Sequence, residues 1–229
     1  MIAMLILIRR ALAPLVLLTL LAACQGGVDA PTAQLQILET AEEAIRAKAK
    51  PPAPRPALTR ATLDKLPGAF LEATRERTGQ TAVLGVNLKR RDSSPGLITV
   101  WRTEDNVTLA MRNGVLIATR GMGGDVISSA VHVTGDRPGP SQGGQRVQHI
   151  KALDNKAVPL PMTCTLTDLG PATIEIVERR HATRHLRESC VTDGGTITND
   201  YWTGGGLVWQ SRQWAGPYIG YLKIRQLTN

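Results

Sequence analysis

From residue 81 onward the chain alternates between apolar and polar residues with a period of two. Such alternation is typical of β-strands that bury one face. Turn residues interrupt it at intervals of about 8 to 12 residues, and Asn113-Gly114 is a strong hairpin signal. The pattern predicts a mainly β fold, an antiparallel meander forming either a sandwich or a barrel-like sheet, and not a wound α/β fold. The expected strands are 81–88, 97–102, 107–112, 115–119, 126–134, 146–153, 162–166, 173–178, 183–190, 196–202, 207–214 and 219–225.

One or two short helices are expected before the strands. In residues 59–66, Thr59 and Thr62 are good caps and Pro67-Gly68 ends the segment. Residues 33–50 place apolar side chains three and four apart, which favours an amphipathic helix, although a frayed linker is the preferred alternative. The proline-rich residues 51–56 predict a stiff, extended spacer.

The first residues have the order of an export signal. Arg9 and Arg10 precede an apolar run of about 11 residues, which is too short to span a bilayer. The run ends in Leu21-Ala22-Ala23-Cys24, which resembles a bacterial lipobox. The alternative is an ordinary secretory peptide with an incidental cysteine, and Met4 is an alternative start. In lipobox proteins the cysteine thiol is lipidated and the signal is cut in front of the cysteine. The α-amine that this cleavage creates then carries a fatty acid such as palmitate.

This motif implies three regions: a signal peptide (1–23), a membrane tether with a short helix and linker (24–58), and a globular β domain (59–229). Several acyl chains on Cys24 form a stable anchor. Gln25, in place of aspartate, resembles an outer-membrane address. We therefore expect a lipid-anchored protein on the periplasmic face of the outer membrane.

Charge adds little specificity. The net charge is +8, and loss of two arginines with the signal leaves +6. A basic surface favours anionic partners, including anionic polysaccharide or lipid headgroups. The expected compartment excludes nucleic acid, and a purely solubilising charge is an equal alternative.

Cys164 and Cys190 are left as a pair once Cys24 is lipidated. An oxidising periplasm favours a disulfide between them, with two buried free thiols as the alternative. Closing that loop predicts about 3 kcal/mol of stabilisation in the chain-entropy model.

Aromatic residues are concentrated near the C-terminus, where six of eight lie in the last 29 positions. Such rings stack on sugars or bind partner proteins, but packing in the core is the favoured alternative. Strict alternation places Trp209 and Trp214 on opposite faces unless a bulge intervenes. The candidate saccharide or partner contacts are Tyr201, Trp202, Trp209, Arg212 and Trp214.

No catalytic motif, cofactor or metal site is predicted. His181 and His185 lie four apart on an expected hairpin and lack an acidic ligand of a known zinc pattern. The glycine-rich loop 121–125 joins two strands and lacks a dinucleotide fingerprint. Three glutamates, Glu175, Glu178 and Glu188, pair as glycosidase acids only by arbitrary choice.

A larger pattern resembles a known family. It comprises Cys190, Asn199, Tyr201-Trp202, Gly204-Gly205-Gly206, Trp209, residues 211–214, Pro217 and Gly220-Tyr221, with Trp101-Arg102-Thr103 and residues 114–125 upstream. Its order resembles the YjbF-type family, which includes group 4 capsule lipoproteins, over roughly residues 56–227. The resemblance implies an outer-membrane lipoprotein that acts in exopolysaccharide or capsule production beside an outer-membrane barrel protein and a periplasmic partner. It implies no catalytic residue.

We therefore expect a non-enzymatic accessory factor in exopolysaccharide export or assembly that binds partner proteins and the polymer. Two alternatives stay open. A carrier of a lipid or acyl chain needs a large apolar cavity. A polysaccharide hydrolase, the weaker alternative, needs two carboxylates in one cleft.

Overall fold

The structure is a computed structural model that describes residues 58–229 apart from residue 153. The expected signal peptide, the lipidated Cys24, the tether helix and the proline-rich spacer lie outside the described residues. Within the described part, no helix is long and apolar enough to cross a membrane.

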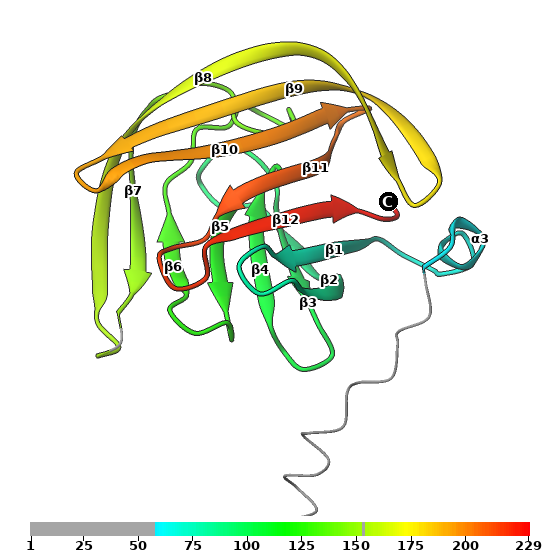
Figure 1. The fold of residues 1–229 in the computed structure, drawn as a ribbon, viewed down its shortest axis with the longest axis horizontal. Helices are drawn as coiled ribbons and strands as arrows, with labels where there is room; N and C mark the ends of the chain where they lie inside the picture. The colour runs from blue at the N-terminus through cyan, green and yellow to red at the C-terminus, as the bar shows by residue number, and fades with distance from the viewer. Residues whose placement is uncertain (1–57, 153) are drawn as a thin grey trace, which may run out of the picture. The chain divides into compact units, whose positions relative to one another are not determined.

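The described residues form one antiparallel sheet, which confirms the expected fold class and selects the barrel-like form (Figure 1). Neighbouring strands follow the order β5-β4-β3-β2-β1-β12-β11-β10-β9-β8-β7-β6. The strands are β1 (Phe70–Arg75), β2 (Gln80–Arg90), β3 (Ile98–Arg102), β4 (Thr108–Arg112), β5 (Val115–Arg120), β6 (Val126–Ser129), β7 (Gly144–Lys151), β8 (Ala157–Ile176), β9 (Arg179–Thr192), β10 (Gly195–Gly204), β11 (Leu207–Trp214) and β12 (Tyr221–Gln226).

The two edges of the sheet, β5 and β6, follow one another in the chain and meet through side-chain contacts. The Val126 amide donates to Thr119 Oγ1, and the Arg120 guanidinium donates to the carbonyls of Val126 and Ile127. These bonds satisfy backbone groups that a ladder between β5 and β6 would otherwise pair. The sheet is therefore a nearly closed barrel.

Local turn chemistry sets several hairpins. Asn113 and Gly114 both have positive φ, 49° and 85°, as a two-residue hairpin turn with the right twist requires. Val177 and Glu178 make the β8–β9 turn with φ of 42° and 63°. The expected Asn113-Gly114 hairpin is thus present as β4 and β5.

Three strand expectations were wrong. No strand was expected at β1, which pairs with β12 more than 140 residues away in the chain. The segments expected at 162–166 and 173–178 fall on one long strand, β8, which ends at Ile176, because the register with β9 shifts at a bulge between Asp168 and Gly170 and the strand continues past it. The strand expected at 126–134 ends at Ser129.

Two apolar clusters position the elements that matter below. The main cluster joins β1–β7 and β12 and includes Leu71, Leu84, Trp101, Leu109, Leu116 and Leu222. A second cluster packs Leu63, Ile176 and Leu227 beneath the single turn of helix α3 (Arg60–Leu63), whose N-cap is Thr59. The Arg60 guanidinium donates to the carbonyls of Ile176, Val177 and Leu227, which fixes α3 against the β8–β9 turn.

Candidate functional site

The register of β9, β10 and β11 sorts the candidate residues onto two faces. Directly paired residues share a face. Glu188 pairs with Asn199, and Tyr201 pairs with Ser211, on one face. Arg187, Asp200 and Arg212 form a row on the opposite face, because Asp200 is paired with both arginines. We call these the inner face and the outer face, since the first is buried and the second is partly exposed.

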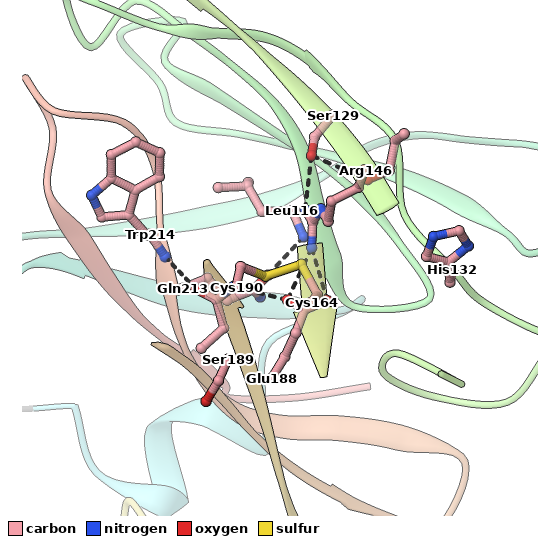
Figure 2. Close-up of polar contacts among 12 residues, drawn as sticks. Leu116, Ser129, His132, Arg146, Cys164, Glu188, Ser189, Cys190, Gln213 and Trp214 are labelled. Atoms are coloured by element: carbon pink, nitrogen blue, oxygen red, sulfur yellow. Dashed lines mark hydrogen bonds and ion pairs between the residues drawn. A yellow bond between two sulfur atoms is a disulfide. The ribbon is translucent and has the colours of Figure 1, made fainter. Parts of the chain in front are cut away.

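A buried ion pair lies at the centre of the inner face. Arg146 Nη1 lies 2.9 Å from both carboxylate oxygens of Glu188, and the two side chains are 5% and 3% exposed. Ser129 Oγ accepts from Arg146 Nη2 at 2.8 Å, and Asn199 Nδ2 donates to Glu188 Oε2 at 2.9 Å (Figure 2). These bonds compensate charges that would otherwise be costly to bury.

Gln213 extends this network across the barrel interior. Its Oε1 accepts from the Leu116 amide at 2.8 Å, and its Nε2 donates to the Gly114 carbonyl at 2.9 Å. Strand β11 is therefore linked to the β4–β5 hairpin, which is not its neighbour in the sheet. The network accordingly crosses the barrel as well as following the sheet.

Tyr201 belongs to this network. Its ring is 1% exposed, and its hydroxyl donates to Gln213 Oε1 at 3.3 Å. Burial and the nearby Glu188 carboxylate raise the pKa of Tyr201 well above its usual value of 10. Its hydroxyl is therefore a neutral hydrogen-bond donor within the core, where it is shielded from partners and polymers.

The structure contains the disulfide between Cys164 and Cys190. The two residues face one another in the β8–β9 register and are both buried. Among the described residues, Cys164, Cys190 and Glu188 form the one group close enough for shared metal ligation. Its sulfurs are bonded to each other, so they provide no thiolate for a metal. The role of this group is structural.

On the outer face, Asp200 connects His185 with Arg187. Its Oδ1 lies 2.8 Å from both His185 Nε2 and Arg187 Nε. Burial raises the pKa of Asp200, but the hydrogen bonds from Arg187 and His185 outweigh it and hold that pKa below 3.8. The His185 ring stacks on Trp202 with centroids 4.4 Å apart and an interplanar angle of 12°.

Arg212 continues the outer face toward β12. Its guanidinium donates to both carboxylate oxygens of Glu76 at 3.0 Å and lies 3.5 Å from the centre of the Tyr221 ring. Burial lowers the pKa of Arg212, yet Glu76 outweighs this effect and raises it. The outer face thus presents paired charges beside the half-buried rings of Trp202 and Tyr221.

Trp209 lies elsewhere, beside α3. It stands opposite the register shift between Trp202 and Thr203, so β11 has the bulge that would alter strict alternation. Its ring packs against the second apolar cluster and lies 3.8 Å from the His181 ring. Burial, with Arg179 and Arg60 nearby, lowers the pKa of His181. His181 and His185 therefore have separate partners and share no metal geometry.

Trp214 lines a cavity of about 540 Å³ at the opposite end of β11. Its backbone amide donates to Asn199 Oδ1 at 2.8 Å, which connects the cavity wall to the interior network (Figure 2). The five candidate contacts therefore occupy four places: the interior (Tyr201), the outer face (Trp202, Arg212), the α3 cluster (Trp209) and the cavity (Trp214).

Two backbone amides of the glycine-rich loop 121–125 already have a hydrogen-bond acceptor within the loop. The Asp125 carboxylate accepts hydrogen bonds from Thr119 Oγ1 and from the amides of Gly121 and Met122. A phosphate placed against these amides would compete with this buried carboxylate. The loop therefore caps the junction of β5 and β6.

The sequence reasoning did not identify Arg146 or Asn199 as partners of Glu188. Arg146 shares the buried face of β7 with Gln148 and Ile150, and its alternation with the apolar Ile150 was the available signal. A charged residue at a core-facing position predicts a buried partner of opposite charge. The partner, however, is 42 residues away in the chain and two strands away in the sheet.

These features define a class: a nearly closed antiparallel barrel with an internal disulfide and a buried, hydrogen-bonded ion pair in its interior. The chain belongs to the YjbF family, whose model, described as group 4 capsule polysaccharide lipoprotein, matches residues 32–227. This confirms the expected family. The match begins within the tether, further upstream than the resemblance from residue 56 had indicated.

A solved structure is similar in fold. It is described as the crystal structure of the hypothetical lipoprotein YmcC from Escherichia coli (K12). The TM-score is 0.60 at 18% sequence identity, and the alignment covers 82% of this chain and 95% of that one. Among curated proteins, no sequence matches this chain. The structural likeness establishes the shared fold alone.

Proposed function

We propose that this protein is an outer-membrane lipoprotein, anchored through Cys24 and facing the periplasm, that assists exopolysaccharide or capsule export without catalysing a reaction. Membership of a capsule polysaccharide lipoprotein family supports the pathway. The lipobox supports the anchor. The partners would be an outer-membrane barrel protein, a periplasmic protein and the polymer itself.

One observation carries the accessory role: the buried Glu188 carboxylate is already bound within the interior. Glu188 is bound to Arg146 and Asn199, so its carboxylate is committed to holding the barrel. Glu175 and Glu178 are exposed at the β8–β9 turn, far along the sheet from Glu188 in register. Glu188 thus forms no pair in one cleft with either of these glutamates, which weakens the hydrolase alternative.

The outer face is the surface we assign to partner or polymer contact. It combines the Trp202 ring with Arg187 and Arg212, both of which carry a charge held in place by a carboxylate. Ordered arginines and aromatic rings are enriched where protein interfaces gain most of their affinity. An anionic polymer would meet the same guanidinium groups.

The test uses cells that lack the gene and carry the full chain in trans. Wild-type protein should restore extracellular polysaccharide, and Cys24→Ser should fail to do so because the domain loses its anchor. Trp202→Ala and Arg212→Ala should lower polysaccharide and co-purifying envelope proteins while leaving the protein in the outer membrane. Lys223→Ala, an exposed change on the same face, is the control. Full restoration by Cys24→Ser, or no loss of polymer on deletion, would contradict the proposal.

A further inference from the structure

The barrel wall opens on one side, between β10 and β11. Strand β10 pairs with β9 from Gly195 to Thr203 but with β11 only from Asp200 to Gly204. From Asp200 back toward Gly195 the two strands diverge, and in Figure 1 the β9–β10 turn extends past the end of β11. Five residues of β10 therefore lack a strand neighbour on this side, within the described part of the chain.

Side chains hold this opening in place. The Trp214 amide donates to Asn199 Oδ1 at 2.8 Å, and the Thr198 amide donates to the Tyr221 hydroxyl at 3.2 Å. Without these bonds, two backbone donors would be left unpaired at the split. Asn199 is also fixed by Glu188, so the opening is tied to the buried network and is a built feature of the barrel.

The cavity of about 540 Å³ occupies this opening and lies within the range of small-molecule sites, roughly 300–1,000 Å³. Most of its wall is apolar or aromatic, and its polar lining is limited to threonines, glycines and the tyrosine hydroxyls. None of its lining residues is an Asp, Glu, Lys, Arg or His. The apolar part of the wall consists of Ile150, Ala152, Val158, Pro159, Leu160, Ile197, Trp214, Pro217, Tyr218 and Tyr221.

We propose that this cavity binds the acyl chain of an anionic amphiphile. Val158 and Tyr218 line it and are 50% and 40% exposed, so an apolar surface stands open to water. An acyl chain would cover that surface without requiring polar partners that the wall lacks. The Arg212 guanidinium already lies against the Tyr221 ring, which leaves that face of the ring unavailable for stacking on a sugar.

A cationic side chain stands next to this lining. The exposed Arg77 donates to the carbonyls of Pro217 and Tyr218, at 3.4 Å and 3.3 Å. A carboxylate or phosphate head would be favoured beside this cation while its chain enters the cavity. The cavity borders the outer face at Tyr221, but the inference stands whether or not the capsule role is correct.

The test uses the full chain in growing cells fed a photoactivatable, clickable fatty acid. After irradiation, the protein is purified and its labelled peptides are mapped by mass spectrometry. We expect label on peptides containing residues 150–160, 192–197 or 214–221, distinct from label on the Cys24 peptide. The mass of the adduct tells whether the chain came from a free fatty acid or a phospholipid.

Two valine variants make the result specific. Val158 lines the cavity, whereas Val191 does not, and both are exposed, at 50% and 59%. Val158→Glu should reduce labelling of the cavity peptides by roughly tenfold, because a carboxylate would be buried against the chain. Val191→Glu should leave it unchanged. Absence of label from the cavity peptides, or an equal loss in both variants, overturns the proposal, as does recovery of a bound oligosaccharide in place of an acyl adduct.

Discussion

Arg146 and Glu188 form an ion pair inside the barrel, with Arg146 Nη1 2.9 Å from each carboxylate oxygen. The pair joins β7 to β9 across the intervening strand β8. Each side chain is almost fully removed from water, so neither charge can be solvated if the other is lost.

Glu188→Gln should therefore destabilise the protein by about 3–5 kcal/mol, because it leaves the Arg146 charge buried without a counterion. The measurement is urea unfolding followed by tryptophan fluorescence. The double change Arg146→Met with Glu188→Gln should recover part of this loss, since it removes the orphaned charge. Glu175→Gln is the control, because that glutamate is 60% exposed and its pair with Arg180 spans 3.7 Å. A Glu188→Gln midpoint equal to wild type would contradict a structural role for the pair.

The Cys164–Cys190 disulfide closes a loop with a sequence separation of 26 residues. Restricting the unfolded chain by such a loop contributes about 3.5 kcal/mol in the chain-entropy model. The double variant Cys164→Ala with Cys190→Ala should lower the free energy of unfolding by about that amount. Reducing agent should destabilise the wild type and leave the double variant unaffected. Equal stability of the two proteins under oxidising conditions would count against the entropic account.

The fold class was predictable because its signals are local. Asn113-Gly114 specifies a tight hairpin by backbone conformation alone, and alternation specifies which face of a strand is buried. Strand β1 was missed because it is short, ends in the charged Arg75, and depends on pairing with the distant β12. Long-range pairing of this kind leaves no mark within a short window of sequence.

The site was predictable only in part for a related reason. The clustering of aromatic residues in the sequence indicated one contact surface, yet a bulge at Trp209 and the divergence of β10 from β11 distribute these rings over separate places. Tyr201 and Trp202 are adjacent in the chain and lie on opposite faces, as strand alternation requires. Which face is interior depends on closure of the whole sheet.

Gly124 is required by a close contact between two loops. A Cβ atom at this position would lie 2.5 Å from Tyr218 Cβ, and its φ is +67°. Gly124→Ala should destabilise the protein by about 2–4 kcal/mol, because the clash adds to the strain of a left-handed backbone. Gly123→Ala is the matched control: its φ is +73° but nothing lies within 4 Å, so about 1 kcal/mol of strain is expected. Thermal unfolding of both variants measures the difference, and equal losses would refute the contact.

Asp92 gives the protein an acid-sensitive contact at the β2–β3 connection. Its carboxylate accepts from Arg112 at 2.6 Å and 2.9 Å and from the Ser94 amide, and these bonds lower the pKa of Asp92 from 3.8 to about 2. A carboxyl whose pKa is lower in the folded state adds stability above its unfolded pKa, and that stability is lost as the pH falls from about 4 toward 2. Asp92→Asn should flatten the stability profile in this window and have its largest effect near neutral pH. Urea midpoints between pH 2 and 7 test this, with Asp193→Asn, an exposed change in the β9–β10 turn, as the control. A profile for Asp92→Asn that falls as steeply as wild type below pH 4 would assign the acid sensitivity to other carboxylates.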